Sequence, residues 1–241
     1  MSHNPFVDEL LNRYSAGDRA FSGVDLREQD LINVQLPEVD FHQADLRQSR
    51  LGKTNFSQGN FVEADLSEAI LWGTNFTQAN LSRAILREAD LSGAILTQAQ
   101  LTASNLIKAS LSGANLSHAN LDSALLIDAD LRSGSDQQTN LSHTNCKGAN
   151  LSYANLSGAL LCRANLEQAK LCRAVLMQRS LGALSAADLT EANLQGADLS
   201  YADLSGVILH RANLRDADLT GAILTQADLT GAILPDGSVH D

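Results

Sequence analysis

The chain of 241 residues places Leu or Phe at every fifth position over most of its length. This spacing is unbroken from Phe21 to Leu131 and resumes from Leu141 to Leu181, with Cys146 as the single replacement. After a change of phase it continues over residues 189–234. A small residue, usually Ala, lies two positions before each Leu, and the residue between them is mostly Asp or Asn. The repeating unit is therefore A-(D/N)-L-x-x.

A period of five fits neither regular secondary structure. In an α-helix of 3.6 residues per turn, these leucines would be spread over all faces, and a flat strand alternates with a period of two. The chain must instead turn at regular intervals and place Leu and Ala inward on short segments. The pattern predicts an all-β solenoid whose coils stack through backbone hydrogen bonds.

The composition excludes several other classes of protein. The chain is 44% hydrophobic, too apolar for a disordered chain, yet no apolar run approaches the roughly 18 residues that a membrane span needs. The polar, acidic start MSHNPFVDEL is unlike a secretory signal, so we expect a cytoplasmic protein without membrane contact. A formal charge of −11 argues against direct nucleic-acid binding, which needs a basic surface.

The spacing of the phenylalanines indicates the size of the coil. Three pairs at the Leu position are separated by twenty residues and two pairs by fifteen, and aromatic rings are expected to stack on one another. Four segments per coil are therefore favoured over three. The residues expected in the core on this basis are Phe21, Phe41, Phe61, Phe56, Phe76, and Leu86, Leu106 and Leu126, which stack along one side.

The tandem units ANLSG, ADLSE and ADLTG resemble those of the pentapeptide-repeat family over residues 21–234. This resemblance implies a right-handed quadrilateral β-helix with about twenty residues per coil. Further segments resemble those of a family member that regulates heterocyst differentiation in filamentous cyanobacteria: ELLNRYSAGDRAF, ILREADLSGA, NLIKASLSGANL, DLRSGSDQQTNL and LPDGSVHD. That resemblance implies protein partners of the HetR or PatU type.

The two ends of the chain depart from the repeat. Residues 1–20 predict a helical cap, with Asn4 as N-cap, Pro5 at the first helical position and Gly17 beyond the end. Its apolar face would cover the first coil through Val7, Leu10, Leu11 and Tyr14. Residues 235–241 form a short, turn-like tail without an apolar helix for dimerisation, which favours a monomer.

Two interruptions of the repeat are candidate contact sites. In residues 132–139, Asp136 takes a position where Leu belongs, and since a lone buried carboxylate is costly we expect an outward loop. In residues 177–188 the phase shifts, and Arg179 takes the place of an inward Ala. The alternative is tolerated slippage between blocks of repeats. The loop residues expected to contact a partner are Arg132, Asp136, Gln137 and Gln138.

Signs of chemistry are absent from the sequence. The six histidines are scattered without metal-ligand spacing, and the three cysteines form no C-x-x-C motif. On a coil of twenty residues no two cysteines lie one coil apart, so we expect no disulfide, and Cys146 is interpreted as a small core residue. We expect no enzyme activity, metal site or cofactor.

Apolar residues at outward positions are therefore the most informative surface feature. Ile85, Ile107, Leu125 and Ile127 flank leucines that stack on one side of the rod, while Ile70 and Trp72 lie on the adjoining side. Such residues could bind a protein partner. The alternative is that Ile is simply a good strand residue, as at Ile95, Ile223 and Ile233.

Three functions remain open on the sequence alone. The first is a non-enzymatic regulatory scaffold that binds proteins through one side of the rod. The second is topoisomerase protection by DNA mimicry, but a rod of about 50 Å has net charge −11, whereas the same length of duplex has about 30 negative charges. The third is a carrier module in which the rod acts only as a spacer.

Overall fold

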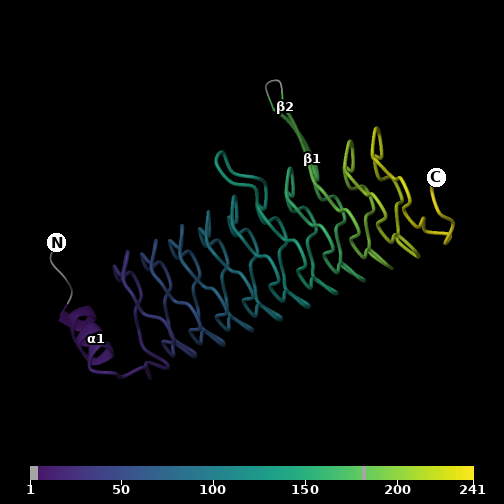
Figure 1. The fold of residues 1–241 in the computed structure, drawn as a ribbon. Helices are drawn as coiled ribbons and strands as arrows, with labels where there is room; N and C mark the ends of the chain where they lie inside the picture. The colour runs from purple at the N-terminus through teal and green to yellow at the C-terminus, as the bar shows by residue number, and fades with distance from the viewer. Residues whose placement is uncertain (1–4, 181–182) are drawn as a thin grey trace.

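The computed structural model describes residues 5–180 and 183–241, and Figure 1 shows them wound into a long rod. Two sequence-based assignments, Asn4 as the N-cap and Leu181 as a core Leu, lie outside the described residues. Along the rod, the residue before each Leu forms a parallel bridge to its counterpart twenty residues on, as in the series Asp65, Ile85, Asn105. The coil therefore has four five-residue sides, and the right-handed quadrilateral β-helix is confirmed.

The repeat satisfies every backbone N–H of a pentapeptide, as residues 79–83 illustrate. The first N–H closes a four-residue turn, the second donates to the preceding coil, and the third and fifth donate to the following coil. The fourth, that of Ser82, donates to the side-chain oxygen of Asn80 at 3.1 Å. Because buried backbone donors need partners, this local bond explains why Asp or Asn so often precedes Leu.

The core consists of the residues that the five-residue period identifies. The rings of Phe41, Phe56, Phe61 and Phe76 have no exposed surface, and Phe56 lies 5.1 Å from Phe61 and 5.6 Å from Phe76 between ring centroids. Phe21 starts this aromatic stack, 6.1 Å from Phe41. The stacking leucines Leu86, Leu106 and Leu126 are equally buried. Alanines fill the other inward positions because the narrow bore has no room for a second large side chain.

Helix α1, Pro5–Ser15, covers the first coil as predicted. Val7 and Leu10 are buried against the core, and Leu11 and Tyr14 pack beside them. The Tyr14 hydroxyl donates a hydrogen bond to the Pro37 carbonyl at 2.7 Å, which fixes the helix to the coil. Among the described residues, no helix has the length and apolar character to span a membrane.

The C-terminal tail folds back on the last coil. Val239 forms an antiparallel bridge with Ile233, and the His240 N–H donates to the Ala232 carbonyl at 2.9 Å. The tail thus pairs with part of an edge that would otherwise be open, which is how β-proteins limit edge-to-edge association.

Both interruptions of the repeat are enlarged turns at the same corner of the rod (Figure 1). Strands β1, Met177–Ser180, and β2, Ala183–Ala186, form an antiparallel hairpin directly after Leu176. The loop 132–138 directly follows Leu131, and Leu131, Leu156 and Leu176 stack in successive coils. The bridge spacing therefore rises from 20 to 25 residues at the loop and to 28 at the hairpin.

The hairpin corrects the expectation of a simple phase shift. Arg179 does not take the place of an inward Ala, because it lies in β1 and pairs with Leu184 of β2. Ala187 holds the inward position instead: it is buried, and its N–H closes the turn onto the Leu176 carbonyl at 2.8 Å. In the loop, Asp136 is exposed, whereas Thr139 is buried in the Ala position.

Candidate protein-interaction surface

The first candidate surface lies on the side of the rod whose inner leucines include Leu86, Leu106 and Leu126, here named the Leu106 face. Four outward side chains on three consecutive coils form what we name the apolar patch. Ile85 and Leu125 are 37% and 39% exposed; half-buried Ile107 lies on the coil between them, and half-buried Ile127 lies on the coil of Leu125. Backbone bonds hold the coils together here, with the Lys108 N–H donating to the Ile127 carbonyl at 3.0 Å.

An exposed Ile before Leu does not by itself distinguish this side. Ile95, Ile208 and Ile223 occupy the same repeat position on other sides and are also exposed. The Leu106 face differs because Ile107 and Ile127 add two apolar residues at the position after Leu, in consecutive coils. The patch is therefore broader than the single exposed residues elsewhere.

Towards the C-terminal end, the edge of the same face has a Tyr–Arg–Tyr stack that the sequence analysis missed. The guanidinium carbon of Arg173 lies 5.9 Å from the ring centroid of Tyr153 and 5.6 Å from that of Tyr201. Both tyrosines are more than half exposed. The Tyr201 ring lies over Gly221, where a Cβ atom would come within 2.7 Å of it.

The signal for this stack was present in the sequence but incomplete. All three residues occupy the second position after Leu, with φ between 58° and 63°, and Tyr153 precedes Arg173 by the regular twenty residues. Tyr201 follows by 28 because the hairpin intervenes. Only the position of the hairpin shows that Tyr201 belongs to the same row.

The ion pairs distinguish Arg173 from most other arginines. Eight arginines lie 2.6–3.2 Å from a carboxylate oxygen, for example Arg163 from Glu191 at 2.8 Å. Arg173 has no such partner among the residues that the structure describes and is exposed.

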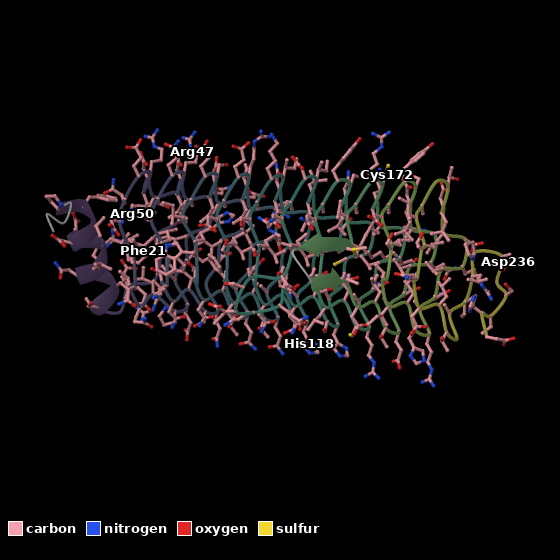
Figure 2. The ribbon with its side chains drawn as sticks, turned by 90° about the horizontal axis from the view of Figure 1, so that it is seen from above. Phe21, Arg47, Arg50, His118, Cys172 and Asp236 are labelled. Atoms are coloured by element: carbon pink, nitrogen blue, oxygen red, sulfur yellow. The ribbon has the colours of Figure 1, made fainter. Side chains whose placement is uncertain are left out.

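Along the outside of the Leu106 face between residues 85 and 175, basic residues outnumber acidic ones. The basic residues are Arg87, Lys108, Lys170 and Arg173, and the acidic residues are Glu88 and Asp128. This stretch is basic on an otherwise acidic rod. Figure 2 shows Cys172, which precedes Arg173, on the same long edge as Arg47, with His118 on the opposite edge.

The second candidate surface is the corner that follows the adjoining side, here named the Trp72 corner. Trp72 is 37% exposed, and its indole packs over Gly52, where an added Cβ atom would come within 2.7 Å of the ring. The Lys53 ammonium lies 4.9 Å from the ring centroid, so the ring is held from one side. Ile70, 38% exposed, flanks it on the same coil.

The loop 132–138 projects from this same corner. Arg132 pairs with Asp130 at 3.0 Å, and the Gly134 N–H donates to the Gln137 carbonyl at 2.8 Å. Gln138 donates from its side chain to the Gly158 carbonyl at 3.4 Å. Arg132, Asp136, Gln137 and Gln138 are all exposed. The sequence-predicted contact residues thus fall into two groups, with loop and Trp72 on one corner and the apolar patch on the adjoining face.

The metal-ligating side chains and the thiols are spread along the rod. Among the described residues, no group of three or more metal-ligating side chains could hold an ion. The three cysteines are free thiols, with Cys146 buried in the core. Burial raises the pKa of Cys146 to about 11, which makes it a poor nucleophile.

Comparisons with known proteins agree with the geometry. The family model described as pentapeptide repeats matches residues 21–58, 60–98, 94–132, 139–177, 183–211 and 197–236. The chain belongs to the pentapeptide-repeat family. A search of curated protein sequences found no match to it.

Among solved pentapeptide-repeat structures, HetL of the cyanobacterium Nostoc sp. strain PCC 7120, described as involved in heterocyst differentiation regulation, is 56% identical to this chain. The match covers 97% of this chain and 98% of HetL, with a TM-score of 0.95. Rfr23 of the cyanobacterium Cyanothece 51142 is 27% identical over 55% of this chain and 98% of its own, with a TM-score of 0.44. QnrB1, a plasmid-mediated fluoroquinolone resistance protein, is 21% identical over 84% of this chain and 90% of its own, with a TM-score of 0.39.

Proposed function

We propose that this pentapeptide-repeat chain is a HetL-type regulatory scaffold that acts in heterocyst differentiation by binding protein partners of the HetR or PatU type. The observation that carries the proposal is the 56% identity to HetL over nearly the whole of both chains. The match covers 97% of this chain, so it extends beyond the repeat units to the segments at both ends and between the repeat blocks.

The scaffold acts without catalysis, as a cytoplasmic monomer. The absence of metal-binding groups among the described residues and the two exposed surfaces support a binding role. Three free thiols suit a reducing compartment, since secreted proteins usually pair their cysteines.

DNA mimicry is the alternative, and the arrangement of charge speaks against it. On the N-terminal part of the Leu106 face, Arg27 and Arg47 alternate with aspartates, and each forms a 2.6 Å ion pair with the aspartate two residues before it. The hydrogen bond from Arg27 lowers the pKa of Asp25 to about 2. These acids are neutralised by neighbours on the rod, whereas the phosphates of a duplex form unbroken rows.

The test is direct binding between the purified chain and purified HetR-type and PatU-type regulators from a heterocyst-forming cyanobacterium. We expect saturable binding to at least one of them. The double variant Ile85→Asp with Leu125→Asp should weaken this binding at least tenfold, because it places charge within the apolar patch.

The matched control is Ile95→Asp with Ile208→Asp, which makes the same change on another side. Asp is the repeat's own residue at all four positions, so both variants should fold and melt like the parent. No binding to either regulator, together with protection of gyrase in a supercoiling assay, would replace the proposal with the DNA-mimic function.

A further inference from the structure

We propose that Arg173, held between Tyr153 and Tyr201, is a receptor for a carboxylate on the partner protein. In this proposal the apolar patch receives hydrophobic residues adjacent to that carboxylate. The inference rests on the protein-binding role proposed above and adds the chemistry of the partner: an exposed Asp or Glu beside apolar side chains.

The geometry of the stack prepares Arg173 for such a contact. A guanidinium is planar and presents five N–H donors at its edge, in a fork that matches the two oxygens of a carboxylate. With the ring centroids 5.9 Å and 5.6 Å from its central carbon, the side chain of Arg173 is confined before a partner arrives. Such confinement lowers the entropy cost of binding.

The ion pairs along the chain indicate that the ligand of Arg173 is a carboxylate from another molecule. Eight arginines already have a carboxylate partner within this chain, at 2.6–3.2 Å. Arg173 has none among the described residues, in a chain whose acids outnumber its bases 28 to 17. A single guanidinium matches one carboxylate in charge and in its two-oxygen geometry. A phosphate dianion would be better served by several cations.

The apolar patch is close enough to act together with Arg173. The coil of Ile127 is hydrogen-bonded to the coil of Tyr153, and that coil is hydrogen-bonded to the coil of Arg173. Arg173 therefore lies two coils along the rod from Ile127. At about 4.8 Å per coil this is about 10 Å, the length of three or four extended residues. One short segment of a partner could therefore place apolar side chains on Ile107 and Ile127 and a carboxylate on Arg173.

The experiment uses a displayed library of random twelve-residue peptides, selected on the full chain. We expect the enriched peptides to contain Asp or Glu within a few residues of Leu, Ile or Phe. Synthetic copies should bind the parent and lose tenfold to a hundredfold in affinity on Arg173→Gln. Replacing the peptide's acidic residue with its amide should cause the same loss, with no further loss on the Arg173→Gln variant.

The matched control is Arg163→Gln, which alters an arginine at the same repeat position that is already paired with Glu191. This variant should bind the peptides like the parent. Bound peptide should also slow alkylation of Cys172, the neighbour of Arg173, and leave the accessibility of Cys162 unchanged. Arg173→Gln should melt like the parent, so that a lost contact is not confused with lost folding.

Several results would overturn the inference. These are enrichment of peptides without acidic residues, no enrichment at all, or unchanged affinity on Arg173→Gln. Preference for a phosphoserine peptide over its Glu counterpart by more than tenfold would assign the site to phosphate instead.

Two further results distinguish failure of this inference from failure of the proposed function. Acidic peptides that bind when HetR-type and PatU-type proteins do not would refute the heterocyst role and leave Arg173 as a carboxylate receptor. HetR-type or PatU-type regulators that bind equally to the parent and to Arg173→Gln would refute the Arg173 receptor and retain the heterocyst role.

Discussion

Most of the pentapeptides contain one residue in an unusual backbone conformation. The second residue after Leu has a φ near +60°, and 28 non-glycine residues adopt a positive φ along the described rod. This left-handed conformation costs an L-residue about 1–2 kcal/mol, and glycine avoids that cost. It is the third residue of the turn that carries the chain from one side of the coil to the next.

A reciprocal pair of substitutions tests this cost. Ala103, with φ 55°, should accept glycine with a gain of about 0.5 kcal/mol, because relief of strain exceeds the added freedom of the unfolded chain. Gly93, with φ 64° and open space around its missing Cβ, should lose about 1 kcal/mol on change to Ala. Urea denaturation followed by circular dichroism measures both. A loss in both variants would contradict the explanation from backbone strain.

The cysteines should differ widely in reactivity at pH 8. Burial, aided by a hydrogen bond to Asp188, raises the pKa of Cys162 to about 11, and burial does the same for Cys146. Because the thiolate is the nucleophile, alkylation of Cys162 should be slow and should accelerate as pH rises towards 11. Cys172 should react first and Cys146 only in denaturant. Mass spectrometry of timed samples gives the order, and Cys172→Ser should abolish the fast phase. Rapid native labelling of Cys146 would contradict its burial.

At the level of elements, the loop and the hairpin are insertions into turns rather than breaks in the helix. The Ala187 N–H bonds to the Leu176 carbonyl as Ala84 does to Leu81, with ten residues between the partners instead of two. Core packing therefore continues past the insertion, and both segments can vary without disturbing the coils. The loop and the hairpin both project from the Trp72 corner, so they contribute to the same surface of the rod.

Both insertions should be removable. Deleting 134–138 leaves Leu131-Arg-Ser-Thr-Asn-Leu141, and deleting 179–186 leaves Leu176-Met-Gln-Ala-Asp-Leu189, each a regular unit. We expect unchanged circular dichroism and a change in stability within about 1 kcal/mol, since loop length contributes weakly. Thermal melts of the two deletion variants measure it. A large loss of stability in either variant would show that the segment packs against the rod.

For the whole molecule, stability comes from stacking, because each coil contacts only its neighbours and no coil has a core of its own. Central coils are covered on both sides, whereas Leu219, Ala222 and Leu224 near the C-terminal end are only partly buried. A defect in the middle of the rod should therefore weaken two interfaces, and one at the end should weaken less.

Overpacking tests this difference between centre and end. Ala119 is fully buried, and Ala119→Leu should cost about 1–3 kcal/mol because the bore cannot widen. Ala222→Leu, the control in the last coils, should cost less because its side chain can reach solvent. Urea unfolding curves of both variants give the two values. Equal costs would mean that the end is as tightly packed as the centre.

The sequence by itself determined the coil, the core and the cap, because each five-residue unit satisfies its own turn and its own inward side chains. It also located both interruptions and the exposed residues of the apolar patch. Only the tertiary structure decided how coils align across the insertions. That alignment brings Tyr201 beside Arg173 over 28 residues and places the loop and the hairpin at one corner. The physical reason is that the five-residue repeat does not continue through an insertion. The alignment of the coils before and after it is therefore set by the backbone hydrogen bonds between those coils.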